Sequence, residues 1–324
     1  MNMDEIHSSP PSVETLALSI IIVSWNTRDL LEACLKSVDA GRGGLNLEVI
    51  VVDNGSTDGT PNLLELDYPW VRLVARDDNV GFPKGNNIGL SEARGRFLLL
   101  LNPDTEIVGD ALPKMVQYLE RRHAVGIVGA QLLNPDGSIQ SSRRRFPTLA
   151  TGFFESTWLQ SLAPQSMMDR YYAEDLPDDV ESEVDWLVGA CLMTRREVLD
   201  EVGLLDEAYF MYSEELDWCR RVKESGWKII YYPDAKILHH VGKSSEQAVT
   251  ARHINYQRAK LRYFRKFHGK LASGFLRIIL LMNYGVQILL EGSKGVIGNK
   301  RSLRWQRVRT YWTVLCSGLK PAGY

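Results

Sequence analysis

Leu18–Val23 reads LSIIIV, and Glu48–Val52 reads EVIVV and runs directly into the polar turn DNGSTDG. Short, nearly continuous apolar runs of this kind are typical of strands that are buried on both faces of a sheet. Between them, residues 29–38 place their apolar side chains on one face of a helix. This strand–helix–strand order predicts an α/β fold built on a parallel sheet.

The same alternation continues toward the middle of the chain and returns after a gap. Patterning weakens over residues 131–184 and resumes at Asp185. We therefore expect an α/β fold with a Rossmann-like, mixed but mostly parallel sheet flanked by helices. The further segments that we expect are strands at 71–75, 97–101, 126–130 and 228–232, and helices at 86–93, 110–122 and 196–202.

Charge and composition divide the chain into three parts. Residues 1–17 are polar and predict a disordered leader. Residues 18–250 form the expected globular domain, with a first half at 18–130 and a second half at 131–250 that begins where the patterning weakens. Residues 251–324 hold fifteen lysines and arginines but one acidic residue, and predict a basic helical extension. The four cysteines form no CxxC pair, which disfavours a zinc or redox motif and fits small buried apolar residues in a reducing compartment.

The basic extension contains an apolar segment at 275–290 that carries Arg277 and Asn283. A membrane-spanning helix needs about 20 apolar residues, so the pattern favours a basic amphipathic helix on a membrane surface. A helical appendage that packs on the domain or on a second subunit is the alternative, which leaves a homo-oligomer open. Nucleic-acid binding is a rival use of a basic, aromatic tail, and the acidic remainder of the chain disfavours it.

Polar residues follow three of the expected strands. Ligands of doubly wound sheets bind outside the carboxyl ends of the strands, so Asp53 and Asp104 should share one edge. Carboxylates there suit a nucleobase, a ribose or a divalent cation. Capping of the next turn is the alternative for each aspartate. The donor-binding candidates are Ser24, Asn26, Asp53, Asn54, Ser56, Asn79, Gly81, Lys84, Asn102 and Asp104.

The segment 77–87 is a glycine-containing turn that opens a helix. Helix N-termini attract anions, and Lys84 is placed to meet a phosphate. The spacing is not that of a P-loop, and an ordinary turn before a helix is the alternative.

Residues 213–217 read SEELD and place three carboxylates in four positions. Crowded carboxylates raise one another's pKa, which suits a general base for a sugar hydroxyl. A solvated first turn of a helix is the alternative, although the aromatic flanks favour partial burial. His239 and His240 follow the last strand, and one of them is expected to complete a metal site.

Six ordered segments between Ser19 and Ser245 resemble the family 2 glycosyltransferases, in particular their rhamnosyltransferase-like branch. They are SIIIVSWNTRDLLEACLKSV, EVIVVDNGSTDGT, DDNVGFPKGNNIGL, FLLLLNPDTEI, DWLVGACLMTRREVLDEVGLLDEAYFMYSEELDWCRR and LHHVGKSS. The resemblance implies a GT-A fold, a divalent metal (Mg²⁺ or Mn²⁺) and inverting transfer by a single displacement. It makes residues 18–250 the catalytic domain, with a nucleotide-sugar-binding half at 18–130 and an acceptor half at 131–250.

The resemblance also assigns roles on the donor side. Asp53, helped by Ser24 and Asn26, corresponds to the reader of a pyrimidine base. Asp104 corresponds to the retained aspartate of a DxD motif whose first position is Asn102 here. His239 matches an H-x-x-G-x-S pattern that continues through Gly242 and Ser244, and is the second expected metal ligand; Lys84 or Arg145 would meet the diphosphate.

On the acceptor side, the resemblance places Trp186, Gly189, Ala190 and Asp217 in the sugar pocket. Glu214-Glu215 stands where the family usually has Glu-Asp, so the base position falls on Glu215, one methylene longer, and either glutamate remains a candidate.

The implied reaction moves a sugar, best fitted by rhamnose from dTDP-rhamnose, to a hydroxyl of a glycan or lipid-linked glycan in cell-surface polysaccharide synthesis. The expected location is the cytoplasm, at the inner face of the membrane, with no nucleic-acid partner. The alternatives are a sugar-phosphate nucleotidyltransferase and a non-catalytic carbohydrate- or nucleic-acid-binding homologue.

Overall fold

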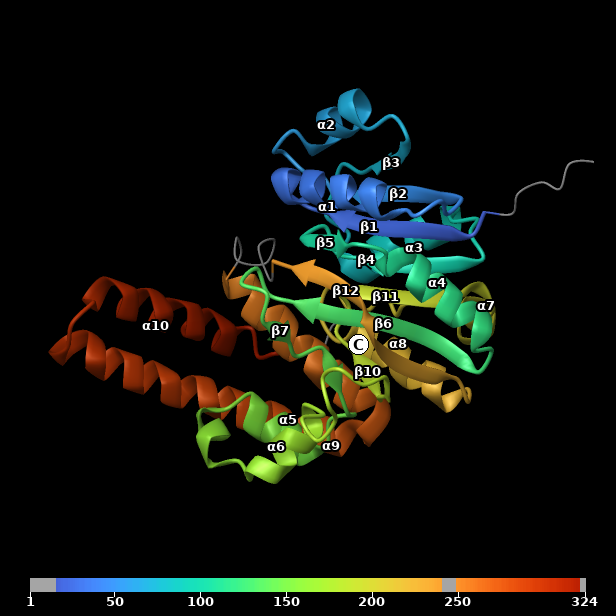
Figure 1. The fold of residues 1–324 in the computed structure, drawn as a ribbon. Helices are drawn as coiled ribbons and strands as arrows, with labels where there is room; N and C mark the ends of the chain where they lie inside the picture. The colour runs from blue at the N-terminus through green and yellow to red at the C-terminus, as the bar shows by residue number, and fades with distance from the viewer. Residues whose placement is uncertain (1–15, 241–248, 321–324) are drawn as a thin grey trace, which may run out of the picture.

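A central sheet of ten strands forms the body of the protein (Figure 1). The computed structural model describes residues 16–240 and 249–320. Along the main path the strand order is β3-β2-β1-β4-β11-β6-β12-β5, with β7 beside β6 and β9 beside β12. The strands of this path are β1 (Leu18–Ser24), β2 (Leu47–Asp53), β3 (Val71–Ala75), β4 (Phe97–Leu101), β5 (Thr105–Val108), β6 (Val125–Leu133), β11 (Cys191–Arg195) and β12 (Lys228–His239).

The first four strands along this order run parallel, as the apolar runs predict. β1 pairs in parallel with both β2 and β4, and β2 with β3. β11 runs antiparallel between β4 and β6, and β5 is antiparallel to β12. The sheet is therefore mixed but mostly parallel, as expected, and the switch at β11 comes from an element that follows the poorly patterned segment.

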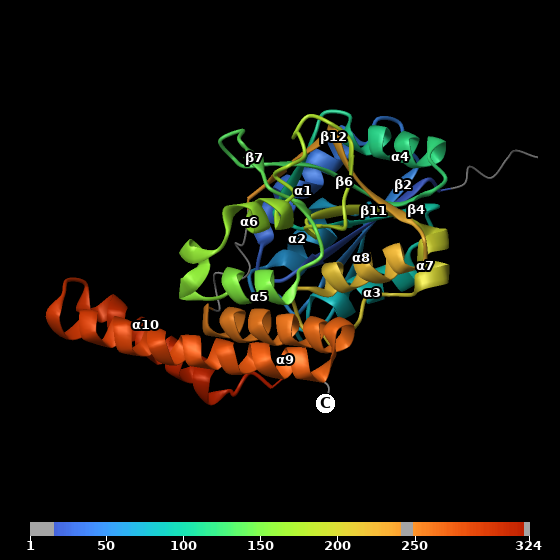
Figure 2. The ribbon, with the colours of Figure 1, turned by 90° about the horizontal axis from the view of Figure 1, so that it is seen from below.

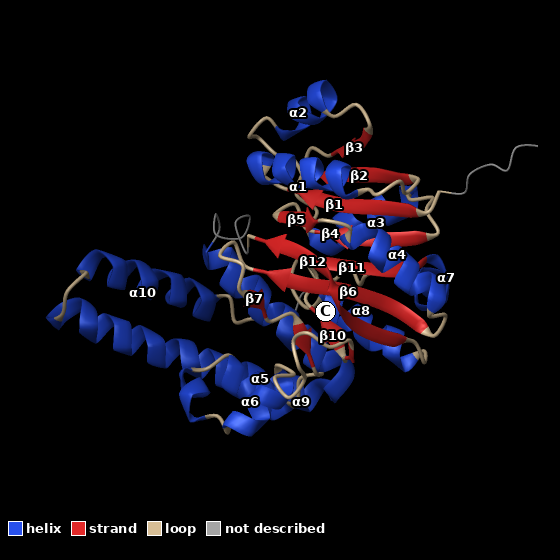
Figure 3. Cartoon of the chain, viewed as in Figure 1, coloured by secondary structure: helices blue, strands red, loops and turns tan. Residues whose placement is uncertain are grey.

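Helices cover both faces of the sheet (Figure 3). One core packs α1 and α4 against the sheet, and the other packs α3, α7, α8 and the C-terminal helices against its opposite face. The helices of the body are α1 (Arg28–Gly41), α2 (Thr60–Asp67), α3 (Phe82–Glu92), α4 (Ala111–Arg121), α7 (Arg196–Val202) and α8 (Glu214–Glu224).

The poorly patterned segment folds into short elements beside the second core. These are β7 (Ile139–Gln140), β8 (Arg143–Arg144), α5 (Leu149–Glu155), the 3-10 helix η1 (Trp158–Leu162), α6 (Gln165–Tyr171), β9 (Ser182–Glu183) and β10 (Trp186–Leu187). None is long enough to produce a clear periodicity, which explains why the sequence predicts so little there.

The C-terminal extension is helical, as predicted, and consists of α9 (Val249–Ile297) and α10 (Arg301–Cys316). Gly269 interrupts α9 with φ 90° and ψ 168°, and the chain reverses there (Figure 2). Ser273 Oγ donates to the Leu261 carbonyl across this reversal at 2.8 Å. We call residues 249–268 the first arm and residues 270–297 the second arm. The second arm and α10 project together beyond the sheet (Figure 1).

Two boundaries and the exposure of one cysteine differ from the sequence-based expectations. α3 begins at Phe82 rather than at residue 86, because Pro83 fits the first turn of a helix. Leu16 and Ala17 belong to the ordered body: the Leu16 carbonyl accepts from the Arg96 N–H at 3.0 Å. Cys316 is exposed, whereas the other three cysteines are buried as expected.

Candidate functional site

The polar ends of β1 and β2 lie side by side. Ser24 and Asp53 are register partners, and both are buried. Asp53 Oδ2 accepts from the Ser56 N–H at 2.9 Å, and Ser56 Oγ accepts from the Asn26 N–H at 2.9 Å. Asp53 Oδ1 is buried without a partner among the described residues. An unpaired buried carboxylate oxygen is costly, so this edge has an acceptor available for a ligand.

The glycine-containing turn before α3 closes over this edge. Asn54 Nδ2 donates to the Gly81 carbonyl at 3.2 Å, and Asn79 Oδ1 accepts from the Gly81 N–H at 3.0 Å. Gly81 has φ +89°, and a Cβ there would lie 2.5 Å from the Phe210 carbonyl oxygen. Only glycine fits this close approach, which ties the donor edge to the segment before α8. Lys84 is exposed on the first turn of α3.

Asn102, Asp104 and His239 meet at the ends of β4, β5 and β12. Asp104 Oδ1 lies 3.4 Å from His239 Nε2, and both side chains are buried. His239 Nδ1 faces the Gln140 amide oxygen at 2.7 Å. Because that oxygen only accepts, Nδ1 is the donor in this contact, which leaves Nε2 as the ring nitrogen on the Asp104 side.

A carboxylate oxygen and an imidazole nitrogen 3.4 Å apart suit a divalent cation, which often takes one or two protein ligands plus phosphate oxygens. Asn102 Oδ1, two residues before Asp104, is buried without a partner among the described residues. The described residues contain no cluster of three His, Cys, Asp or Glu side chains that would hold a metal by themselves. The residues present therefore fit a metal that is completed by a bound diphosphate. Gly242 and Ser244 of the H-x-x-G-x-S pattern lie outside the described residues.

Glu214 and Glu215 open α8 after a strained turn. Tyr212 and Ser213 have φ of 75° and 62°, a region that non-glycine residues rarely adopt. Each glutamate has its Oε2 atom buried without a partner among the described residues. Burial raises the pKa of both carboxyls, and Glu215 adds to the rise in the pKa of Glu214. Raised pKa values suit a group that must accept a proton.

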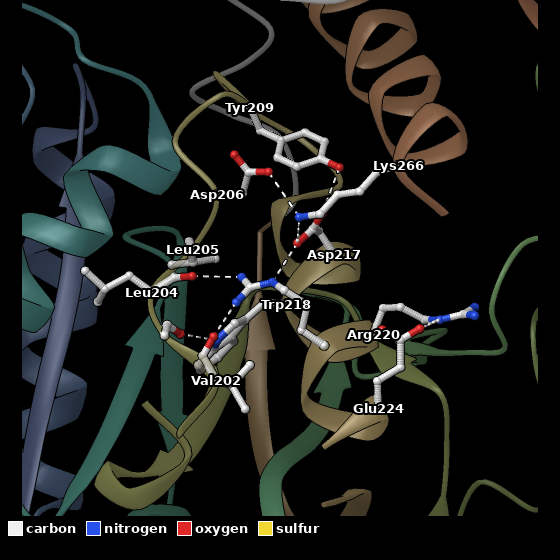
Figure 4. Close-up of polar contacts among 12 residues, drawn as sticks. Val202, Leu204, Leu205, Asp206, Tyr209, Asp217, Trp218, Arg220, Glu224 and Lys266 are labelled. Carbon is white, nitrogen blue, oxygen red and sulfur yellow. Dashed lines mark hydrogen bonds and ion pairs between the residues drawn. The ribbon is translucent and has the colours of Figure 1, made fainter. Parts of the chain in front are cut away.

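A charged network fixes α8 to the first arm of α9 (Figure 4). Asp217 is fully buried, and its carboxylate accepts from Lys266 at 2.7 and 2.9 Å, from Arg221 at 2.9 Å and from Tyr209 at 3.1 Å. Lys266 also reaches Asp206 at 3.2 Å. Asp217 was expected in the sugar pocket; it is fully buried and is not among the residues that line the pocket described below.

A pocket of about 230 Å³ lies beside Glu215. Trp186 lines it, and a Cβ on Gly189 would lie 3.4 Å from the Glu215 side chain. Of the two glutamates, Glu215 lines this pocket and Glu214 does not. Seven of its fifteen wall residues are aromatic, and the wall comes from segments far apart in sequence: Arg144, Pro147, Glu155, Tyr171, Tyr172, Trp186, Val188, Tyr212, Ser213, Glu215, Leu216, Tyr256, Lys260, Tyr263 and Phe264.

The sequence missed the part of this wall that comes from the first arm of α9. Tyr256, Lys260, Tyr263 and Phe264 share one helical face, so their spacing is a signal that could have been found. Arg144 lines the pocket, whereas Arg145, which was expected to meet the donor diphosphate, does not line it. Arg145 pairs with Asp175 at 3.0 Å, away from the pocket wall. Ala190 is buried, and its carbonyl accepts from the Asn102 N–H at 3.0 Å, which links the pocket to the donor edge.

Comparison with known proteins supports a glycosyl-transfer site. Residues 19–203 match the model of glycosyl transferase family 2. The N-acetylglucosaminyl-diphospho-decaprenol L-rhamnosyltransferase of Mycobacterium tuberculosis is 31% identical over 242 residues, which cover 71% of this chain and 78% of that protein. The rhamnosyltransferase WbbL of Escherichia coli is 25% identical over 229 residues, covering 68% and 82%.

Solved structures share the fold. The mannosyltransferase PcManGT from Pyrobaculum calidifontis, in complex with GDP-Man and Mn²⁺, superposes with a TM-score of 0.55 at 18% identity and covers 93% of this chain and 84% of that one. GalNAc-T7 with UDP, GalNAc and Mn²⁺ gives 0.55 at 14% identity, covering 78% and 48%. At these identities the likeness concerns the fold, which is of the GT-A type.

Proposed function

Since this chain belongs to glycosyl transferase family 2, we propose that it transfers rhamnose from dTDP-rhamnose to a hydroxyl of a lipid-linked sugar, with inversion at the anomeric carbon. Relatives named as rhamnosyltransferases support the sugar, and one of them is named for a sugar linked through diphosphate to a lipid. The observation that carries the mechanism is Glu215, which lines the pocket and has an unpaired carboxylate oxygen.

Glu215 is the general base of this proposal. The acceptor hydroxyl lies in the pocket, Glu215 removes its proton, and the oxygen attacks the anomeric carbon from the side opposite the nucleotide. A positioned base contributes about 10²–10⁴-fold to such a step. Holding donor and acceptor in line contributes further acceleration. Glu214, which does not line the pocket, supports the turn that aims Glu215.

The donor nucleotide binds at the strand-end edge. Asp53 offers its unpaired oxygen to the pyrimidine base, next to Ser24 and Asn26. Asp104 and His239 would hold Mg²⁺ or Mn²⁺, which when bound neutralises the charge of the departing nucleoside diphosphate. The exposed Lys84 at the start of α3 adds a positive charge on the same side.

The pocket is suited to an acceptor sugar that carries a phosphate. Aromatic faces such as Trp186 and Tyr256 give a sugar ring flat apolar surfaces. Their polar tips are held by protein, since Trp186 Nε1 donates to the Arg145 carbonyl and the Tyr256 hydroxyl donates to Glu155, each at 3.0 Å. Arg144 supplies a guanidinium, and its hydrogen bonds within the described chain go to neutral groups, the Ser141 hydroxyl at 2.8 Å and the Arg143 carbonyl at 2.7 Å. A guanidinium with neutral partners remains available for a diphosphate oxygen.

The test is a panel of dTDP-, UDP- and GDP-sugars, each offered with Mg²⁺ or Mn²⁺ and a synthetic lipid-diphosphate sugar as acceptor. We expect dTDP-rhamnose to give dTDP and a rhamnosylated lipid in which the anomeric configuration is inverted. Release of pyrophosphate instead of nucleoside diphosphate would identify a nucleotidyltransferase. Retained configuration, or transfer that persists fully in a chelator, would refute the mechanism proposed above.

A further inference from the structure

The second arm of α9 exposes a stripe of large apolar side chains. Leu271 is 91% exposed, Phe275 64%, Ile278 60%, Met282 66% and Leu289 74%. Successive members are three, four or seven residues apart, so they lie on one face of the helix. We call these five residues the apolar stripe. A contiguous exposed apolar surface of this kind marks an interaction site.

The opposite face of the same arm packs on protein. Leu276, Leu280 and Tyr284 are buried there, and Arg277 Nε donates to the Gly318 carbonyl beyond α10 at 2.7 Å. The helix passes a length and composition test for a membrane span, with a mean hydropathy of 1.5 in a window that is 22% buried. Because its packed face carries polar groups that bond to the rest of the chain, a position in the plane of a membrane fits better than a span.

Exposed positive charge is concentrated on the same pair of helices. Lys270, Lys294, Lys300, Arg301 and Arg309 lie on the second arm, the α9–α10 turn and α10, and all are exposed or partly so. The one acidic residue of this region, Glu291, is already paired with Arg304 at 2.7 and 2.8 Å. Two copies facing each other through this surface would bring like charges together, which disfavours a second copy as the occupant. An anionic surface is complementary to it.

Two tryptophans complete the pattern on α10. Trp305 is 46% exposed and Trp312 58%, and their spacing of seven residues places them on one helical face. Tryptophan side chains favour the headgroup level of a bilayer, where the ring is buried and its N–H stays hydrated. An apolar stripe, basic charges and interfacial tryptophans together describe a surface for lipid rather than for a soluble protein.

We propose that the second arm of α9 and α10 lie flat on an anionic phospholipid bilayer, with the apolar stripe inserted at the boundary between headgroups and acyl chains. The first arm, which is joined to the second at Gly269, lines the acceptor pocket. Docking in this way holds that pocket next to the membrane, where a lipid-linked acceptor is found. The inference does not depend on which sugar is transferred.

The test is flotation of the full chain with vesicles of phosphatidylcholine alone or with about one third phosphatidylglycerol. The variant is Phe275→Ser/Met282→Ser, and the matched control is Leu66→Ser, which removes a leucine that is 80% exposed on α2. We expect the wild type and the control to float with anionic vesicles in a salt-sensitive manner. We expect at least about a tenfold lower partition coefficient for the variant, because two large apolar groups no longer insert.

Two flotation results would overturn the proposal: no flotation of the wild type with anionic vesicles, or equal flotation of the stripe variant. Resistance of the bound protein to alkaline carbonate extraction would also overturn it, because such resistance marks a spanning helix. So would a wild-type dimer in vesicle-free solution that the variant does not form. Turnover with a short-chain, water-soluble acceptor is measured on the same samples. We expect it to be unchanged in the stripe variant, so a failure of docking is distinguishable from a failure of the transferase assignment.

Discussion

Replacing Glu215 with glutamine removes the proposed base while leaving the shape of the pocket nearly unchanged. The side chain lines the pocket, stands beside Gly189 and has one unpaired buried oxygen. The amide of glutamine has almost the same size, but it does not accept a proton at neutral pH. The change therefore affects the chemical step rather than packing.

The expected loss is set by the contribution of a general base. Such a base contributes about 10²–10⁴-fold, which corresponds to about 2.7–5.5 kcal/mol in the activation barrier. We expect Glu215→Gln to lower kcat by this factor. The affinity for the nucleotide sugar should survive, because Asp53 and Asp104 bind the donor from a different edge. The assay combines single-turnover transfer with calorimetric titration of dTDP-rhamnose.

The pH dependence gives an independent measure of the same environment. Burial raises the pKa of Glu215, and only the ionised form accepts a proton. Transfer should therefore rise with pH through a value above the ordinary glutamate pKa of 4.5. Glu214→Gln is the matched control, since it should keep this acidic limb and much of its turnover.

The free energy of unfolding should change with pH in the direction opposite to the transfer activity. The pKa of Glu214 is raised in the folded state, so its contribution to stability is fully present below the unfolded value and is lost as pH rises through the folded value. A glutamine at position 214 does not ionise. As pH rises, the free energy of unfolding of Glu214→Gln should therefore increase relative to that of the wild type. The increase should be about 1.4 kcal/mol for each unit by which the folded-state pKa of Glu214 exceeds its unfolded-state pKa. Near-normal turnover of Glu215→Gln, or loss of turnover in Glu214→Gln alone, would refute our assignment of the base.

Two further changes test the rest of the site. Asp104→Ala should remove the Mg²⁺- or Mn²⁺-dependent part of donor affinity by at least about tenfold, because a cation loses one of two protein ligands; calorimetry with and without metal measures this, and unchanged metal-dependent affinity would contradict the site. Lys266→Met should destabilise the fold by about 2 kcal/mol and lower kcat, because the buried Asp217 keeps Arg221 and Tyr209 but loses its ammonium partner. Rescue by Lys266→Arg in thermal unfolding and turnover would support this prediction. An unchanged melting temperature and kcat in Lys266→Met would contradict it.

The donor edge was predictable from the sequence because its residues follow strands. Parallel strands end at one edge, so Asp53 and Ser24 had to meet once the strands were identified, and the structure makes them register partners. The Gly81 turn was predictable as a glycine-containing loop before a helix. The close approach of Gly81 to the Phe210 carbonyl was not predictable, because Phe210 lies far along the chain and its position depends on how the second half folds.

The acceptor side was harder to predict for a physical reason. Its pocket is made by side chains from short elements between 143 and 188, from the turn before α8 and from the first arm of α9. Short elements carry little periodicity, and the contacts between them are set by packing rather than by local propensity. The carboxylates of 214–217 were visible as a cluster, but which of Glu214 and Glu215 lines the pocket, and that Asp217 bonds to Lys266, depend on contacts with distant segments.

The candidate site extends beyond the part of the chain that matches the family. The family match ends at residue 203, and the donor-binding strand ends, except His239, lie within it. The base, the aromatic wall of the pocket from α9 and the Lys266 contact to Asp217 all lie beyond it. The proposed donor-binding residues, except His239, are thus held within the matched region. The pocket is shared between the two parts, because its wall residues between 144 and 188 lie within the match and Glu215 and the α9 residues lie beyond it. The first arm of the basic extension therefore packs as one unit with the candidate site, since four of its residues line the pocket and Lys266 bonds to Asp217 of α8.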